Sequence, residues 1–145
     1  MKALLQRVSR AQVDVGGECV GKIDRGLLVL LGIDQGDDRG VADRMLDKML
    51  AYRMFSDDTD RMNLSVTDVS GGVLLISQFT LSADTRRGLR PGFSTAMPPA
   101  DAEQLYLYTL EKLRARYPDV AAGVFGADMQ LSLTNDGPVT FLLEV

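Results

Sequence analysis

Three short stretches of the chain carry residue types that could do chemistry. The first, Ser77-Gln78-Phe79-Thr80, follows the apolar run at 73–76. A polar pair after an apolar run marks the point where a strand leaves the core, and strand ends followed by long loops often carry sites. A lone serine or threonine without a base is a poor nucleophile. Taken alone, the stretch is therefore expected to satisfy backbone groups at a sheet edge.

The second stretch is Asn135-Asp136-Gly137-Pro138, directly before the apolar run at 139–145. Asn, Asp and Gly all favour a turn, but proline cannot donate a ladder hydrogen bond where the returning strand should begin. A cis Gly-Pro bond would turn rigid backbone carbonyls outward. Only about 5% of X-Pro bonds in folded proteins are cis, so the residues alone favour an ordinary trans bond in a slightly long loop.

The third stretch holds Arg86, Arg87 and Arg90 in a loop rich in glycine and proline. Guanidinium groups at this spacing could grip phosphate through paired hydrogen bonds. A solvated loop is the more common reading of such a cluster.

Composition removes several kinds of enzyme. The chain of 145 residues has no histidine and one cysteine, Cys19, so it cannot form a Ser-His-Asp triad, a Cys-His pair or a disulfide framework. We find no set of residues that calls for a metal, and we expect no cofactor. The net charge of −4 argues against a broad nucleic-acid binder but leaves a small local contact with RNA open.

Hydrophobic periodicity predicts the elements that must position these stretches. Alternation and short apolar runs predict strands, and a 3.6-residue period predicts two helices, the first of which has a Met-rich apolar face. The expected strands are 2–9, 11–15, 18–23, 26–33, 73–80 and a final pair, 129–134 and 139–144, joined across the Asn-Asp-Gly turn. The expected helices are 36–55 and 101–117, with polar connections at 56–72 and 119–128.

This order predicts one α+β domain over residues 1–145, with mostly antiparallel β sheets curled into a barrel-like core and two amphipathic helices packed outside. No apolar run is long enough to span a bilayer, and the first residues lack the features of a signal peptide. With its single cysteine, the chain is expected to be cytoplasmic.

The three stretches occur together with other segments in a fixed order, and the set resembles the D-aminoacyl-tRNA deacylase family. The resemblance covers the whole chain and rests on these segments: QRVSRA at 6–11, GLLVLLGI at 26–33, MNLSV at 62–66, SQFTL at 77–81, ADTR at 83–86, FGADMQ at 125–130 and NDGPVT at 135–140.

The resemblance implies a homodimer that hydrolyses the ester between a D-amino acid and the terminal ribose of tRNA, and that also removes glycine. It implies a catalytic segment of Ser77, Gln78, Phe79 and Thr80, with the active site at the subunit interface. It further implies that the Gly137–Pro138 bond is cis, enters the partner subunit's pocket and acts as the chirality filter.

Given that resemblance, we expect the Gly-Pro turn to form a rigid wall that excludes L side chains but cannot reject glycine. The substrate's ribose hydroxyl is expected to assist, while N–H groups of Phe79 and Thr80 stabilise the oxyanion. A Thr80 nucleophile is the competing mechanism. Phe125, Met129 and Arg86 are candidates for binding the acceptor end of the RNA.

Two other classes stay open. One is a hydrolase of small esters or amides with Thr80 or Ser77 as nucleophile. The other is a homodimeric binding module without catalytic activity. The first predicts turnover of simple esters and loss of activity on Thr80→Ala, whereas the second predicts no hydrolysis of any charged tRNA.

Overall fold

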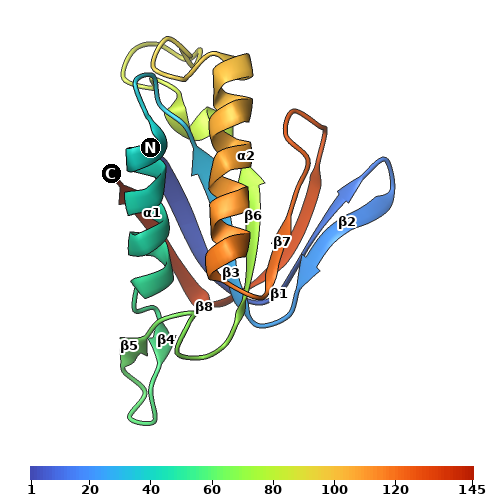
Figure 1. The fold of residues 1–145 in the computed structure, drawn as a ribbon, viewed down its shortest axis with the longest axis vertical. Helices are drawn as coiled ribbons and strands as arrows, with labels where there is room; N and C mark the ends of the chain where they lie inside the picture. Colours follow the sequence, from blue (N-terminus) through green and yellow to red (C-terminus); the bar gives the residue numbers. More distant parts are fainter.

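A single long strand organises the protein. The computed structural model describes residues 1–145 (Figure 1). In it, β1 (Lys2–Val15) pairs antiparallel with three other strands, β2 (Glu18–Ile23), β3 (Gly26–Gly32) and β8 (Gln130–Glu144). The predicted hairpin at Gly16-Gly17 is confirmed, because β1 and β2 pair across it.

The sheet continues on the far side of β3 and curls back toward β2. β6 (Gly72–Ser77) pairs parallel to β3, and β7 (Val120–Ala122) pairs parallel to β6. A Cβ on Gly21 of β2 would lie 2.8 Å from the carbonyl oxygen of Ala122, so the two edges approach closely only because glycine has no side chain. The predicted barrel-like α+β core is thereby confirmed.

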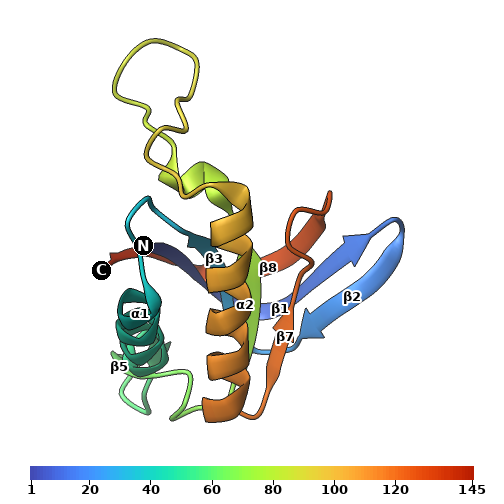
Figure 2. The ribbon, with the colours of Figure 1, turned by 45° about the horizontal axis from the view of Figure 1, so that its top comes forward.

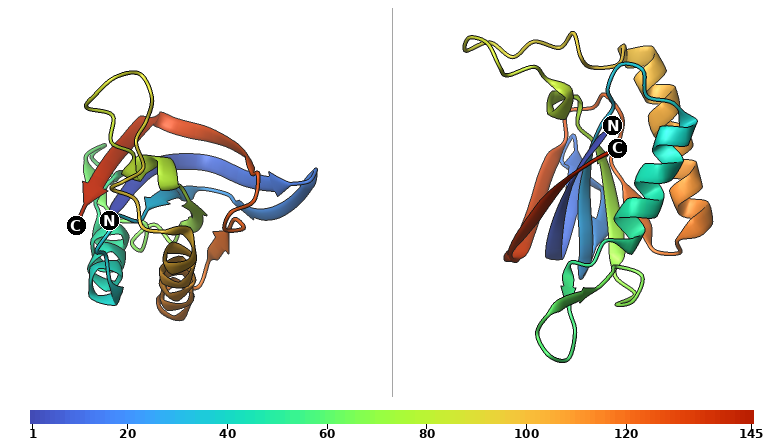
Figure 3. Two further views of the ribbon diagram at one scale, coloured as in Figure 1. Left: turned by 90° about the horizontal axis from the view of Figure 1, so that it is seen from above. Right: turned by 90° about the vertical axis from the view of Figure 1, so that its left-hand side faces the viewer.

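Both helices cover the same face of the sheet (Figure 3). α1 (Arg39–Ala51) begins after Asp38, whose carboxylate accepts a hydrogen bond from the Val41 N–H at 2.8 Å. α2 (Pro99–Arg116) begins with proline, which is well tolerated in a first helical turn. Neither helix combines the length and hydropathy needed to cross a membrane.

Two apolar clusters hold these layers together. The larger lies between the sheet and the helices and includes Met45 and Met49, so the Met-rich face of α1 is core, as expected. The smaller cluster lies within the curl of the sheet. Its buried members are Val8, Ala11, Val13, Ile23, Leu28, Leu74 and Ile76.

Several predicted boundaries were wrong. The final strand pair is one strand, β8, because residues 130–134 and 140–144 both pair with the 14-residue β1 and not with each other. The polar connection at 56–72 contributes to a small hairpin of β4 (Phe55–Ser56) and β5 (Met62–Leu64), and the expected loop at 119–128 contains β7. These short strands have too few residues to show a period.

Candidate active site

The Ser77–Thr80 stretch sits where two parallel strands end side by side. β6 ends at Ser77, and the chain then forms a 3₁₀ turn, η1 (Phe79–Ser82), so the predicted strand to Thr80 was too long. A Cβ on Gly32 would lie 2.8 Å from the Leu81 Cβ, which shows that η1 packs directly on the end of β3. This packing ends the strand and removes the face alternation expected for the stretch.

A cleft of about 830 Å³ opens beside η1, and most of its lining is apolar. Three residues of the predicted catalytic stretch line it, namely Ser77, Gln78 and Phe79, and so do Phe125 and Met129 from the segment before β8. The structure therefore brings together residues almost fifty positions apart. A largely apolar cavity with a few polar groups is the usual form of a small-ligand site.

Phe79 is the most exposed aromatic side chain at the rim of this cleft. It is 63% exposed, and its ring packs against that of Phe93 with centroids 5.0 Å apart. Phe93 also lines the cleft. The pair offers an apolar surface on which a planar base could stack.

Thr80 lies next to the cleft but not in its lining. Its hydroxyl oxygen accepts a hydrogen bond from the Gln78 side-chain amide, and no carboxylate or amine accepts the Thr80 proton. The N–H groups of Phe79 and Thr80 open the 3₁₀ turn, where backbone donors have no acceptor within the turn. The turn therefore has unpaired backbone donors, whereas the Thr80 hydroxyl has no base beside it.

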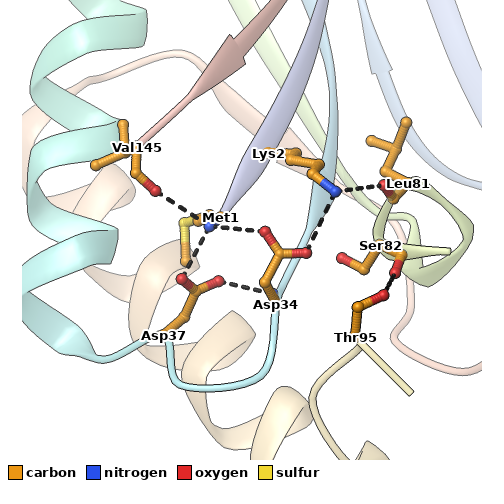
Figure 4. A network of polar contacts seen from close by, with 8 residues as sticks. All are labelled: Met1, Lys2, Asp34, Asp37, Leu81, Ser82, Thr95 and Val145. Carbon is orange, nitrogen blue, oxygen red and sulfur yellow. Dashed lines mark hydrogen bonds and ion pairs between the residues drawn. The ribbon is translucent and has the colours of Figure 1, made fainter. Parts of the chain in front are cut away.

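A network of charges anchors the rear of η1 (Figure 4). The Lys2 ammonium donates to the Leu81 carbonyl at 3.3 Å and lies 3.6 Å from the Asp34 carboxylate. The buried α-ammonium of Met1 lies 3.0 Å from Asp34 and 2.8 Å from Asp37. The first two residues of the chain thus connect η1 to the loop before α1.

Asp34 is the central acid of this network. Burial alone would raise its pKa, but the Ser82 hydroxyl, the N-terminal ammonium and Lys2 stabilise the carboxylate more strongly, so the pKa is lowered. The Ser82 hydroxyl is buried, and no donor or acceptor lies within full hydrogen-bond geometry of its oxygen. Thr95 ties the next loop to the same place, because its hydroxyl donates to the Ser82 carbonyl.

The structure does not bring Arg86 into the cleft. Its guanidinium forms a two-pronged pair with Asp84, with Nε and Nη2 each 2.9 Å from a carboxylate oxygen. Hydrogen bonds from the side chain and backbone of Arg86 hold the pKa of Asp84 well below its usual range. Arg86 is thus already paired within its own loop.

The Gly137–Pro138 pair lies in a bulge of β8, apart from the cleft of its own chain. Asn135 pairs with Val8 and Thr140 pairs with Gln6, so the intervening residues bow out from β1. The peptide bond between Gly137 and Pro138 is cis.

Side chains on both flanks hold this bulge. Arg7 donates from Nε to the Asp136 carbonyl at 3.0 Å and from Nη1 to the Met54 carbonyl at 3.1 Å. The Asn135 side-chain oxygen accepts from the Val139 N–H at 3.0 Å. The two groups bracket Gly137, whose φ of +133° suits only glycine.

Comparison with known proteins assigns the chain to a family. The family model described as D-Tyr-tRNA(Tyr) deacylase matches residues 4–144. The chain belongs to this deacylase family. D-aminoacyl-tRNA deacylases of Stutzerimonas stutzeri and Pseudomonas putida are each 59% identical to it, over 99% and 100% of both chains respectively.

Solved structures similar to this deacylase-family chain agree with its fold. The structure of a c-Myc DNA unwinding element binding protein superposes with a TM-score of 0.96 at 44% identity, covering 100% of this chain and 99% of that one. A probable eukaryotic D-amino acid tRNA deacylase superposes with a TM-score of 0.84 at 15% identity, over 99% and 98% of the two chains. At that identity the second likeness supports the fold alone.

Reasoning from the sequence missed three residues at the site of this deacylase-family member. Phe93 lines the cleft, Arg7 holds the Gly-Pro bulge, and Asp34 anchors η1. Arg7 falls within the QRVSRA segment, so the resemblance could have pointed to it. No feature of the neighbouring sequence marks Phe93 or Asp34 as site residues. No group of three His, Cys, Asp or Glu side chains is arranged to hold a metal ion.

Proposed function

We propose that this protein hydrolyses the ester bond of D-aminoacyl-tRNA and of glycyl-tRNA, and spares L-aminoacyl-tRNA. The observation that carries the proposal is the apolar cleft closed by Ser77, Gln78 and Phe79 at the ends of β3 and β6, in a chain that matches the deacylase family from residue 4 to residue 144. Charged tRNA is the substrate, and the cytoplasm is where we expect the reaction.

The proposed reaction uses backbone groups and water. Water adds to the ester carbonyl carbon, the bond to the ribose oxygen breaks, and that oxygen leaves with a proton that originates from the water. The N–H groups of Phe79 and Thr80 stabilise the oxyanion, and the neighbouring ribose hydroxyl orients the water. The missing base at the Thr80 hydroxyl and the absence of histidine from the chain both support this route over a threonine nucleophile.

The apolar part of the cleft suits the terminal adenosine. Phe79 and Phe93 offer one aromatic surface, and Phe125 and Met129 contribute to the same lining. Phe125 is itself fixed, since its ring packs 5.7 Å from that of Tyr106 on α2. Stacking on aromatic side chains is a common way to hold an unpaired base.

Chirality is proposed to be read by exclusion. D and L esters carry the same groups, so a rigid wall where an L side chain must point rejects every L amino acid alike, and glycine passes. The Gly137–Pro138 bulge is the candidate wall, and Arg7 and Asn135 hold it on both sides. Because the bulge lies away from its own chain's cleft, a second copy of the chain must supply it, which supports a homodimer with the active site at the interface.

The first experiment compares hydrolysis of D-Tyr-tRNA, L-Tyr-tRNA and Gly-tRNA by the purified protein. Rapid loss of the D and glycyl esters with the L ester spared is expected. Equal hydrolysis of D and L esters would contradict the filter but keep the esterase. Failure to hydrolyse any of the three would favour a binding module without catalytic activity.

Two substitutions at one position separate the mechanisms. Thr80→Ala removes the hydroxyl and is expected to retain most activity, whereas Thr80→Pro removes the N–H and should lower kcat by about 100-fold or more. The reverse order of effects would identify the hydroxyl as the nucleophile. Circular dichroism of both variants checks that η1 has not unfolded.

A further inference from the structure

We propose that the loop of residues 83–98, which we call the arm, is a second RNA-binding surface, and that Arg87 and Arg90 on it bind phosphates of the tRNA acceptor strand. This inference rests on the proposed function. Its experiment is chosen so that the two can fail separately.

The position of the arm is the first argument. It extends from the body of the protein beyond η1 and the start of α2 (Figure 2). Its returning limb supplies Phe93, Ser94, Ala96 and Met97 to the lining of the cleft. An RNA whose last nucleotide occupies the cleft would leave it past the arm, so the preceding phosphates would come near the tip.

Charge is the second argument. The arm contains three arginines and one acid, Asp84, for a net charge of +2 in a chain whose net charge is −4. Arg86 is paired with Asp84. Arg87 and Arg90 are exposed and form no ion pair or side-chain hydrogen bond. The excess positive charge of the arm therefore resides on two unpaired guanidinium groups.

Hydrogen bonds between residues of the arm hold its neck together. Asp84 and Gly92 exchange two backbone hydrogen bonds, of 2.7 and 3.0 Å, which close the neck of the loop. Asp84 further accepts from the Arg86 backbone N–H at 3.0 Å. Gly88, with φ of +69°, turns the chain at the tip between the two free arginines. Arg87 and Arg90 therefore lie within the short loop that this neck closes.

RNA phosphate fits this surface better than other partners. Guanidinium groups bind phosphate oxygens in pairs. The substrate proposed for the cleft brings a row of phosphates with it, whereas the remainder of the protein is acidic. The acidic surface of a second copy of the chain is the competing partner for the arm. Loss of such docking would change the sedimentation of the arm variant.

The experiment compares the double variant Arg87→Gln/Arg90→Gln with a control of equal charge, Arg44→Gln/Arg114→Gln. Arg44 lies on α1 and Arg114 on α2; both are exposed and unpaired. Two readouts are measured from low to moderate salt: the Kd for uncharged tRNA, and kcat/KM for D-Tyr-tRNA. A third is hydrolysis of D-tyrosyl-adenosine, an ester that lacks the acceptor strand.

The arm variant should bind uncharged tRNA about tenfold or more weakly at low salt, with the slope of log Kd against log salt reduced by about 1.5. Its kcat/KM for D-Tyr-tRNA should fall in parallel, while hydrolysis of D-tyrosyl-adenosine and the behaviour of the control stay near wild type. An unchanged salt slope, an equal loss in the control, or a shift in sedimentation of the arm variant would overturn the proposal. If the wild-type protein hydrolyses neither ester, the proposed function fails, and the tRNA-binding slopes still decide the role of the arm.

Discussion

Arg7 offers a direct test of how the Gly137–Pro138 bulge contributes to selectivity. Its side chain is only 14% exposed, and its guanidinium donates to two carbonyl oxygens, those of Asp136 and Met54. Arg7→Lys keeps the charge, but a single ammonium cannot reach both carbonyls in the same geometry. The substitution should therefore loosen the bulge without removing it.

The expected magnitude follows from one lost contact. A hydrogen bond to a charged group contributes roughly 1.5–3 kcal/mol, so a loss of about 2 kcal/mol is a reasonable central value. If the bulge excludes L side chains, that loss corresponds to a decrease of about 30-fold in the ratio of kcat/KM for the D and L esters. The kcat/KM for D-Tyr-tRNA itself should change little, because the cleft residues are untouched.

The assay measures deacylation of D-Tyr-tRNA and L-Tyr-tRNA by Arg7→Lys and by a matched control, Arg10→Lys. Arg10 lies three residues further along β1, is exposed and has no ion pair. An unchanged D/L ratio in Arg7→Lys would refute the role of the bulge as a filter. A parallel fall for both esters, with a lower melting temperature, would show that Arg7 supports the fold instead.

Three further substitutions test the packing and the electrostatics. Gly26→Ala would drive a Cβ into the backbone carbonyl of Gly72 in β6, so we expect at least about 3 kcal/mol of destabilisation in urea. The matched Gly92→Ala, where the nearest atom to the new Cβ is 3.8 Å away, should cost less than about 0.5 kcal/mol. Tyr106→Phe removes the buried 3.0 Å hydrogen bond to the Leu75 carbonyl and should lower the free energy of unfolding by about 1 kcal/mol. Because the pKa of Asp34 is lowered from 3.8 in the folded state, its stabilisation is complete well above pH 3.8 and is lost as the pH falls below that value. Asp34→Asn should therefore be less stable than wild type at pH 7, and the gap should close toward pH 3 in thermal melts; a gap independent of pH would contradict this assignment.

Local patterns in the sequence were enough for part of the architecture. The hairpin at Gly16-Gly17 and both helices were predicted from turn chemistry and periodicity, which depend on neighbouring residues alone. β8 was not, because its two halves look like a hairpin unless one knows that β1 is long enough to pair with both. The end of β6 at Ser77 was missed for a similar reason, since contact with Gly32 of another strand sets it.

The site was predictable only in part. The short stretch at 77–80 was recognised as a strand end with polar residues, but nothing in its composition indicated a reaction. Its grouping with Phe125 and Met129 came from resemblance to a family, and the structure now places Ser77, Gln78 and Phe79 in one cleft with them. The arginine loop shows the opposite case. Its pattern allowed three phosphate ligands but favoured a solvated loop, and it did not show that Arg86 pairs with Asp84 and leaves only two arginines free.

The separation of the cleft from the Gly137–Pro138 bulge within one chain has a consequence for accuracy in the cell. If the wall of one chain guards the cleft of another, an isolated folded chain would present its backbone donors to an ester but would lack the barrier against L substrates. Accuracy would then depend on protein concentration, whereas turnover would not. At very low expression the protein would then also hydrolyse correctly charged tRNA, so its abundance would need a lower limit.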